Sequence, residues 1–418
     1  MMATGSGKTK AAMYAISQID PWKLLLICVP SLELVEQWEA DVHLFYPDIT
    51  IIKCGSPYRG HKELLKSLTQ AHFPEQVVVI STYDSAQGDF YMAKWRQAKP
   101  EQFAMICDEV HNMGAPKSQC LMELNPAYRI GLSATPRRNF DEIGSEKILN
   151  FYHQNTFEFS IKDAQREHYL VEYQYRVLPC AMPEEDWESY KAYSKEIVQL
   201  QHALEQEDDE KDRLRLQQRI EGRYRDRAKL LKKNDQKVQT LQTIFDEIPP
   251  SARVLIYGDD LNHLDELGKE LDRMGKYYFK YTGELDAQKE RPTILKEFRQ
   301  GIRKILLAVG CLDEGIDIPA CDVAVFISSS TSERQFIQRR GRVLRIAPGK
   351  TTAWIYDYLV YPILPASTSD EERRMALSMI DAQYRRINLM VDDAINGIRE
   401  HQKLDQFLSQ RKLNPYDF

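Results

Sequence analysis

The sequence lacks the features that would indicate a membrane or secreted protein. No apolar run approaches the roughly 20 residues that cross a bilayer, and no signal peptide precedes the first glycine-rich segment. No internal repeat or low-complexity tract stands out. We therefore expect a cytoplasmic protein with no membrane association.

Cysteine pairs of the CxxC type are also missing. The chain has 7 cysteines among 418 residues, and several lie inside apolar runs. This pattern indicates small buried side chains in a reducing compartment, with a metal site as the alternative.

An excess of basic residues is absent as well. Lys and Arg total 56 against 62 Asp and Glu, so the formal net charge is −6. This charge argues against a uniformly basic surface for nucleic acid. It does not exclude a local basic channel, because phosphate contacts depend on where the cations lie. The length and the 43% hydrophobic content suit two or three globular domains.

The most informative segment present is a glycine-rich loop at residues 2–9, Met-Ala-Thr-Gly-Ser-Gly-Lys-Thr. In such a loop the backbone N–H groups surround phosphates, the lysine reaches the outer phosphates and the threonine hydroxyl ligates Mg²⁺. The residues expected to bind nucleotide are Thr4, Gly5, Ser6, Gly7, Lys8 and Thr9. A phosphate loop of this kind normally follows a buried strand. No residues remain before this loop to form that strand, so we expect the strand to be missing, relocated or supplied by a partner.

The first 160 residues alternate short apolar runs with amphipathic stretches, which predicts βαβ units and a parallel sheet with its functional loops at the carboxyl ends of the strands. The expected strands are Leu24–Val29, Val77–Ile80, Phe103–Cys107 and Ile130–Leu132, and the expected helices include Ser31–Tyr46 and His61–Leu68.

A second βαβ series follows a strongly charged stretch at 182–240 that predicts long helices. Its expected strands are Val254–Tyr257, Lys276–Tyr281, Ile305–Val309, Val323–Ile327 and Ala353–Tyr358. We therefore predict one α/β domain at 1–165, a second at 166–360 that includes the helical insertion, and a helical C-terminal tail at 361–418.

The insertion has an acidic run at 205–210 and a basic run that begins at Arg223 and continues to Lys233. Two interpretations stay open: a solvated helical hairpin, or a basic surface that grips a nucleic-acid backbone.

A second chemical motif follows the apolar run that ends at Cys107. Asp108 at the tip of a strand can hold the Mg²⁺ that Thr9 also contacts, and Glu109 can orient and deprotonate the attacking water. Ser133 and Thr135 follow the next strand, where their hydroxyls can hydrogen-bond His111 and link the nucleotide site to a polymer-binding surface.

The second half of the sequence contains a segment with several arginine side chains. In the segment Gln338–Arg345, Arg342 and Arg345 are three residues apart, so on a helix they would share a face and reach one phosphate group. Guanidinium groups from a second domain can neutralise charge on a γ-phosphate during hydrolysis. Upstream, Gly315 permits close backbone approach and Asp317 can bind ribose or an arginine.

These motifs occur in a fixed order: ATGSGKT, VPSLELVEQW, DEVH, LSATP, YTGE, DEGIDIP and QRRGRVLR. The ordered set resembles the superfamily 2 helicases and translocases over residues 2 to about 358. DEVH together with QRRGRVLR looks most like the XPB-like and restriction-subunit-like DExH branch.

The resemblance implies two tandem RecA-like domains, each a parallel sheet flanked by helices, that close on ATP and Mg²⁺. It implies catalytic roles for Lys8, Asp108, Glu109 and the arginine fingers Arg342 and Arg345, and places Gln338, Gly315 and Asp317 near the nucleotide. Nucleic acid would lie along Pro30, Ser31, Ser81, Thr82, Tyr83, Thr282 and Gly283, in contacts to its backbone.

Three departures from the family pattern stand out. The strand before the phosphate loop and the segment that usually reads adenine are missing, Met2 replaces the first glycine of the loop pattern, and Arg138-Asn139-Phe140 stands where XPB-like proteins carry Arg-Glu-Asp. A duplex-opening role based on that last element has no support in this sequence.

The leading hypothesis is an ATP-dependent helicase or translocase that acts on nucleic acid, with DNA favoured over RNA, as the motor of a larger repair, restriction or anti-phage complex with protein partners. The alternative is an ATP-switched scaffold subunit that needs a partner to complete its fold. A small-molecule kinase does not account for the motifs of the second half.

Overall fold

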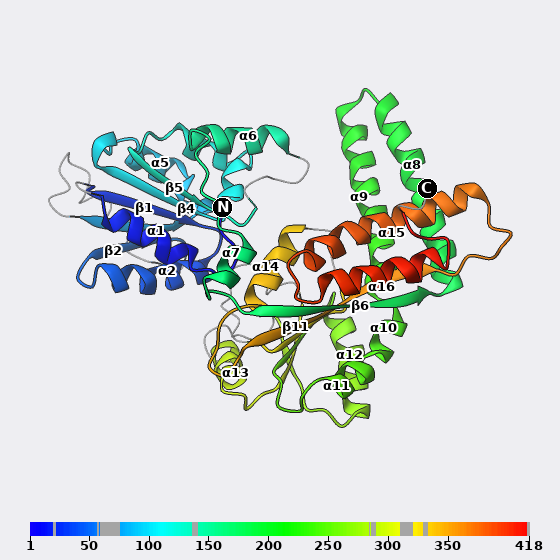
Figure 1. The fold of residues 1–418 in the computed structure, drawn as a ribbon. Helices are drawn as coiled ribbons and strands as arrows, with labels where there is room; N and C mark the ends of the chain where they lie inside the picture. Colours follow the sequence, from blue (N-terminus) through cyan, green and yellow to red (C-terminus); the bar gives the residue numbers. More distant parts are fainter. Residues whose placement is uncertain are drawn as a thin grey trace. The chain divides into compact units, whose positions relative to one another are not determined.

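The computed structural model describes residues 1–19, 22–56, 58, 76–135, 141–283, 285, 290–309, 321–328 and 333–415. These residues form two compact units (Figure 1). The first holds residues 1–170 and the short segment Ile337–Gly341, and the second holds the rest of the described chain. Among the described residues, no helix is both long and apolar enough to cross a membrane.

The first unit is built on a sheet with the strand order β2-β3-β1-β4-β5, in which every described pair is parallel. The strands are β1 (Leu24–Val29), β2 (Thr50–Cys54), β3 (Val77–Thr82), β4 (Phe103–Asp108) and β5 (Tyr128–Leu132). The four strands expected from apolar runs are confirmed, whereas β2 was not foreseen because only two of its five residues are fully buried.

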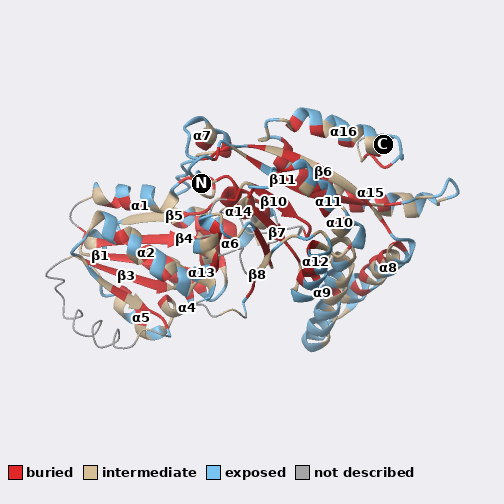
Figure 2. Cartoon of the chain, turned by 90° about the horizontal axis from the view of Figure 1, so that it is seen from below, coloured by how far each residue is buried: buried red, intermediate tan, exposed pale blue. Residues whose placement is uncertain are grey.

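Helices cover both faces of this sheet, because alternate residues of a strand point to opposite sides. Leu25 and Ile27 face the core formed with α1 (Lys8–Ser17) and α2 (Leu32–Phe45). Leu24 and Leu26 face the opposite core. That second core is formed with α4 (Tyr83–Ala86), α5 (Asp89–Trp95), η2 (Val110–Gly114), η3 (Ser118–Glu123) and α6 (Glu142–Phe151). The buried strands between these layers are visible in Figure 2.

Two short elements complete the first unit, η1 (Pro100–Gln102) before β4 and α7 (Ile161–Arg166) near its end. The expected helix at His61–Leu68 lies outside the described residues.

The second unit has a sheet with the order β6-β11-β10-β7-β9-β8, again parallel in every described pair. Its strands are β6 (Glu172–Met182), β7 (Val254–Tyr257), β8 (Phe279–Tyr281), β9 (Ile305–Ala308), β10 (Val323–Phe326) and β11 (Thr352–Pro362). The five expected strands are confirmed within a few residues at their ends. β6 was not foreseen, and it pairs along its whole length with β11.

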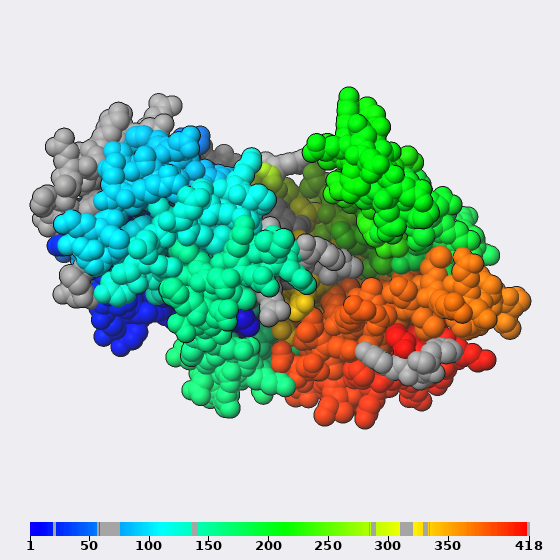
Figure 3. Space-filling view, turned by 90° about the horizontal axis from the view of Figure 1, so that it is seen from above, coloured from blue at the N-terminus to red at the C-terminus, as the bar shows by residue number. Residues whose placement is uncertain are grey.

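The charged insertion is helical, as predicted. It forms a long hairpin of α8 (Glu184–Gln206) and α9 (Glu210–Lys232) that projects from the second sheet (Figures 1 and 3). The chain returns to that sheet through α10 (Asp235–Gln239) and α11 (Leu241–Glu247). α12 (Leu261–Arg273), α13 (Glu290–Arg299) and α14 (Glu333–Val343) then alternate with the strands.

The last two helices, α15 (Asp370–Val391) and α16 (Gly397–Ser409), pack on strands β11 and β6 of the second sheet. Ser369 caps α15 by accepting a hydrogen bond from the Glu372 amide, and three acidic residues occupy its first turn, where they favour the helix dipole. Residues from 361 onward therefore belong to the same compact unit as the second sheet.

Candidate ATP site

The phosphate loop has the backbone conformation that its glycines permit. Gly5 and Gly7 have φ values of 87° and 90°, in the left-handed region that a side chain disfavours. The Ser6 hydroxyl donates a 2.7 Å hydrogen bond to the Ala3 carbonyl and closes the loop on itself. α1 then begins at Lys8, so its first N–H groups and the positive end of its dipole face the loop.

Two buried polar atoms at this loop are available for a ligand. Among the described residues, neither the Thr4 hydroxyl nor the Lys8 ammonium has a hydrogen-bond partner. A buried polar group without a partner costs free energy unless a ligand satisfies it. A helix N-terminus, a buried ammonium and a hydroxyl together match the chemistry of a nucleotide phosphate chain. The residues of the loop therefore fit the ATP that the sequence predicts.

The second motif lies beside this loop. Asp108 ends β4 and Glu109 follows it with a left-handed backbone, φ 44°, which is rare for a residue with a side chain. The Glu109 carboxylate is 3.8 Å from the Lys8 ammonium and 3.5 Å from Nδ1 of His111. The structure thus brings Lys8, Glu109 and His111 together beside Asp108, and their roles in catalysis stay predictions.

Two aromatic residues hold Asp108, and sequence reasoning gave neither of them this role. The Trp38 indole donates a 2.9 Å hydrogen bond to Oδ2, and the Glu109 amide donates one of the same length to Oδ1. The Tyr83 hydroxyl donates to the Asp108 carbonyl at 2.8 Å. The carboxylate therefore has a fixed orientation, which a metal-linked acid requires.

The residues that follow β5 also contact one another. The Ser133 hydroxyl accepts a 3.0 Å hydrogen bond from the Thr135 amide, and the Thr135 hydroxyl is buried without a hydrogen-bond partner among the described residues. Their link to His111, which is itself 1% exposed, stays a prediction.

The arginine segment needs one correction. α14 ends at Val343, so Arg342 lies in its last turn whereas Arg345 lies beyond it, and the two do not share a helical face as expected. Beyond the helix, the Lys350 ammonium donates hydrogen bonds to the carbonyls of Val343 and Arg345. Gln338 and Arg342 are both buried. Gly315 and Asp317 lie outside the described residues.

Two family models match the chain. Residues 1–138 match "Type III restriction enzyme, res subunit", and residues 236–347 match "Helicase conserved C-terminal domain". These regions contain the two groups of motifs described above.

Curated relatives agree with these models. The chain is 24% identical to a DNA 3'-5' translocase XPB2 of Sulfurisphaera tokodaii, over 82% of this chain and 74% of the relative. It is 27% identical to a putative DNA 3'-5' helicase Rad25 of Haloarcula marismortui, over 82% of this chain but only 47% of that relative. Among solved structures, an ATP-dependent Type ISP restriction-modification enzyme, LlaBIII, bound to DNA matches with a TM-score of 0.62 at 18% identity. That match covers 95% of this chain and 28% of the other.

The chain belongs to the superfamily 2 helicases, on their XPB-like or restriction-subunit-like branch. The two parallel sheets flanked by helices are the tandem RecA-like domains of this superfamily.

In this superfamily 2 chain, the residues predicted to contact nucleic acid differ in exposure. Ser81 is fully buried and Tyr83 nearly so, and the hydroxyl of Tyr83 bonds to Asp108. Tyr83 therefore supports the candidate ATP site from inside, and neither residue is exposed for contact with nucleic acid. Thr282 is buried as well, whereas Pro30, Ser31, Thr82 and Gly283 are at least partly exposed.

Most basic side chains of the α8–α9 hairpin contact acidic or aromatic side chains of the same hairpin. Arg223 lies 3.7 Å from Glu196 and 3.3 Å from Asp226, and Arg227 lies over the rings of Tyr190 and Tyr224. Arg225 and Lys229 remain exposed. These contacts favour the solvated hairpin over a surface that grips nucleic acid.

The cysteines do not form a metal site within the described residues. No group of three or more metal-binding side chains occurs there, and the six described cysteines are free thiols, five of them buried. Burial raises the pKa of the Cys54 thiol to about 12, so it stays protonated at neutral pH.

Proposed function

We propose that this chain is the motor of a DNA-processing complex and couples ATP hydrolysis to movement along DNA. The observation that carries the proposal is the contact between the two motifs of the first unit, in which the Lys8 ammonium lies 3.8 Å from the Glu109 carboxylate. A lysine that reaches the outer phosphates and a residue that orients the attacking water are both recurring parts of ATP hydrolysis. Membership of superfamily 2 supports the same chemistry.

In this proposal the loop residues Thr4 to Thr9 bind the phosphates of ATP, with Lys8 reaching the outer ones. Thr9 and Asp108 hold Mg²⁺, which supplies charge neutralisation at the phosphates when bound. Trp38 and the Glu109 amide fix the carboxylate of Asp108. Glu109 orients the attacking water and takes its proton.

Residues of the second half complete the proposed reaction. Arg342 and Arg345 provide guanidinium groups that stabilise charge on the γ-phosphate, and Gln338 contributes a buried amide to the nucleotide. Gly315 and Asp317, which lie outside the described residues, are proposed as further contacts to the nucleotide. Domain closure on ATP and reopening after hydrolysis then drive the steps.

DNA is the proposed polymer because both curated relatives carry names of DNA-acting enzymes. Pro30, Ser31, Thr82 and Gly283 are the proposed contacts to its backbone, since they combine exposure with small or hydroxyl groups. Protein partners are proposed because residues 1–138 match a family model that is named for a subunit, the res subunit of the Type III restriction enzymes. The scaffold alternative is not favoured, because the matched relatives are named as motors.

The test is ATP turnover by the purified chain with single- and double-stranded DNA and RNA at one fixed salt concentration. We expect DNA to raise turnover more than RNA does. Salt must be fixed because backbone contacts make apparent affinity depend strongly on it. Equal turnover with and without every polymer would contradict the proposal.

A matched pair of variants tests the catalytic assignment. Glu109→Gln keeps the size of the side chain but removes the proton acceptor, so stimulated turnover should fall by about 100-fold or more. Glu146→Gln, on the exposed face of α6, should leave turnover unchanged. Wild-type turnover in Glu109→Gln would remove Glu109 from the mechanism.

A further inference from the structure

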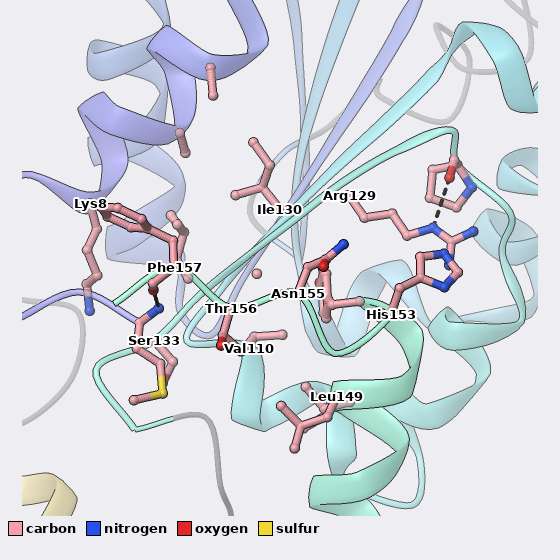
Figure 4. A pocket seen from close by; sticks show the side chains of 18 of the residues that line it. Lys8, Val110, Arg129, Ile130, Ser133, Leu149, His153, Asn155, Thr156 and Phe157 are labelled. Carbon is pink, nitrogen blue, oxygen red and sulfur yellow. Dashed lines mark hydrogen bonds between the residues drawn. The ribbon is translucent and has the colours of Figure 1, made fainter. Parts of the chain in front are cut away.

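Two cavities of the structure differ in the residues that line them. One, of about 610 Å³, borders β5 in the first unit, and Lys8 and Ser133 line it (Figure 4). It therefore adjoins the candidate ATP site. The other, of about 560 Å³, lies within the second unit. None of the described residues that were predicted to bind ATP or nucleic acid lines this second cavity.

The second cavity lies at the edge of the second sheet where the strands begin. Arg253 directly precedes β7, Asp322 directly precedes β10, and Thr352 is the first residue of β11. The strand directions of a parallel sheet bring all amino ends to one edge and all carboxyl ends to the other. Gly283, the proposed DNA contact of this unit, follows β8 and so belongs to the opposite edge. The cavity is therefore separate from that contact.

Positive charge predominates in the lining of the second cavity. Arg253, Arg299 and Lys350 are cations, and Asp322 is the single carboxylate among the described lining residues, which leaves an excess of two positive charges. The chain as a whole has the opposite balance, with 56 basic against 62 acidic residues. One phosphate group carries about −1.5 to −2 charges at neutral pH, which would compensate this excess.

The one carboxylate is already paired. Nε of Arg253 donates to Oδ2 of Asp322 at 3.0 Å, and a terminal nitrogen of the same guanidinium donates to Oδ1 at 2.8 Å. Burial raises the pKa of Asp322, but the hydrogen bonds and charge of Arg253 lower it below its usual value, so the carboxyl is ionised at neutral pH. Arg253 and Asp322 thus compensate each other, and the excess charge comes from the other cations.

Lys350 is a buried cation of this cavity, with 9% of its surface exposed. Its ammonium donates hydrogen bonds to the carbonyls of Val343 and Arg345, neither of which is charged. It makes no ion pair within the described parts of the chain. Burial lowers the pKa of this ammonium, and the charge of Arg253 lowers it further. An ammonium has three donors, so one N–H remains for a ligand whose negative charge would favour the charged form.

The turns and hydroxyl groups around Lys350 add further donors. Ser251 and Thr351 are exposed residues that line the cavity, and their hydroxyls make no hydrogen bonds to other described residues. Gly301 and Gly349 have φ values of 73° and 76°, and no described atom lies within 4 Å of the position that a Cβ would take at either one. Their backbone is therefore open to close approach by a ligand.

We propose that this cavity binds a small phosphorylated molecule, with its phosphate group beside the Lys350 ammonium and with lining hydroxyls as further donors. Hydrogen bonds from an ammonium to phosphate oxygens are among the strong ones in proteins. The volume of about 560 Å³ lies within the range of about 300–1,000 Å³ that is typical of small-molecule sites, so the cavity has room for the rest of such a molecule.

The test is isothermal titration calorimetry of the full chain with inorganic pyrophosphate at one fixed salt concentration. All proteins carry Lys8→Ala, which weakens phosphate binding at the candidate ATP site. We expect one pyrophosphate to bind for each chain. Citrate should bind more weakly, because a carboxylate offers two oxygens and one charge where a phosphate offers three oxygens and up to two charges.

A pair of variants at Thr351 tests the location of the site. Thr351 is exposed and lines the cavity, so either a glutamate or a glutamine is accommodated there. Thr351→Glu places a negative charge next to Lys350 in the chain and should weaken pyrophosphate binding by about tenfold or more. Thr351→Gln has nearly the same size without the charge and should keep most of the affinity.

A second pair tests the buried cation. Lys350→Met should weaken pyrophosphate binding by about tenfold or more, because it removes a charged hydrogen-bond donor. Lys304 is exposed and donates to the Pro250 carbonyl at 3.3 Å, but it does not line the cavity. Lys304→Met should therefore change the affinity by less than about twofold. Melting temperatures establish that each variant folds, and the Thr351 pair decides the question if Lys350→Met does not.

Four outcomes overturn the proposal. Pyrophosphate does not bind, it binds equally to Thr351→Glu and Thr351→Gln, or citrate binds at least as tightly. In the fourth, Thr351→Glu weakens the binding of duplex DNA as much as that of pyrophosphate, and the cavity is then a contact for the polymer. None of these measurements depends on ATP turnover, so failure of the proposed motor function would be seen separately.

Discussion

Among single residues, Trp38 helps to fix the orientation of a carboxylate in the candidate ATP site. Its indole N–H donates a 2.9 Å hydrogen bond to Oδ2 of Asp108. The Glu109 amide donates a hydrogen bond to the other carboxylate oxygen, Oδ1. Each of the two carboxylate oxygens uses one lone pair for these hydrogen bonds. The other lone pair of each oxygen points away from the two donors. A side chain that orients a metal-linked carboxylate typically changes metal affinity 10–100-fold when it is removed.

We therefore predict that Trp38→Phe raises the Mg²⁺ concentration needed for half-maximal ATP turnover by about tenfold or more. The ring still fills the core, but the donor to Asp108 is lost. The measurement is a Mg²⁺ titration of steady-state ATPase activity.

The matched control is Trp95→Phe, since Trp95 is also buried in the first unit but donates to the Ala86 carbonyl, away from Asp108. If Trp38 only supported the fold, both variants would lower ATP turnover. The Mg²⁺ concentration needed for half-maximal turnover would then stay the same. An unchanged midpoint in Trp38→Phe would show that Trp38 does not position the metal ligand.

Asp108 and Glu109 could be predicted from the sequence because an apolar run followed by two carboxylates places them at a strand tip. Trp38 could not be assigned a role in the same way. Its contact joins residues 70 positions apart, and the motif VPSLELVEQW contains no feature that indicates which side chain turns inward. The buried positions of Ser81 and Tyr83 were missed for a related reason, since hydroxyl groups after a strand suit either a ligand or an internal carbonyl.

At the scale of secondary-structure elements, one buried ion pair joins α15 to the second sheet. Arg386 of α15 donates to both carboxylate oxygens of Asp357 on β11, at 3.0 and 3.2 Å, and to the Tyr358 carbonyl. Tyr175 on β6 donates to the same carboxylate at 2.9 Å. The Tyr358 amide also donates to Oδ1 at 2.8 Å. Asp357 is fully buried, and Arg386 is the cation among these donors that compensates its charge.

We predict that Arg386→Met destabilises the second unit by about 3–5 kcal/mol, because it leaves a buried carboxylate uncompensated. Urea unfolding followed by circular dichroism measures this change. The exposed neighbour Arg385 pairs with Asp381 on the same helix, and Arg385→Met should cost at most about 0.5 kcal/mol. Equal effects of the two variants would show that burial of the pair is not what matters.

A buried histidine at the start of α12 makes stability depend on pH. His263 is 1% exposed, and its Nδ1 accepts a hydrogen bond from the Asp259 amide. Burial lowers its pKa from 6.5 to about 4, with a further contribution from the nearby positive charge of Lys237. The other charged groups that act on it are Asp259, Lys233 and Asp260.

Because the folded state keeps His263 neutral, the unfolded state binds the proton first as the pH falls. His263 therefore makes its full contribution to the free energy of unfolding above pH 6.5. This contribution is lost as the pH falls from 6.5 to about 4, and the loss is roughly 3 kcal/mol at most. His263→Asn retains an acceptor near Nδ1 but does not titrate. Unfolding free energies of both proteins across this range should converge as the pH falls, and parallel curves would contradict the assignment.

Elements formed by continuous apolar runs could be predicted closely, and those formed by mixed sequence could not. β7 and β9 consist of buried residues throughout, whereas buried and less buried residues largely alternate in β6, which contains Glu172, Gln174 and Arg176. Its pairing with β11 depends on tertiary packing rather than on local composition. The position of Arg345 beyond the end of α14 was also missed, because the spacing of two arginines does not indicate where a helix ends.

At the scale of the whole molecule, the proposed motor divides its catalytic groups between two compact units. Lys8 and Glu109 belong to the first, and Arg342 belongs to the second. If these groups act on one triphosphate, weakening one of them changes what the other can contribute. If they belong to independent sites, each change acts alone.

We therefore predict that Lys8→Arg and Arg342→Lys are strongly non-additive in ATP turnover. Each keeps a positive charge and should reduce kcat/KM only in part, so that the double variant remains measurable. Groups that act as a unit give a double variant that is hardly slower than the worse single variant. Arg411→Lys on the exposed C-terminal surface serves as the control and should combine with Lys8→Arg additively. Additive losses for Lys8 and Arg342 would mean that the two units do not share a reacting phosphate, and stepping driven by their closure on ATP would lose its basis.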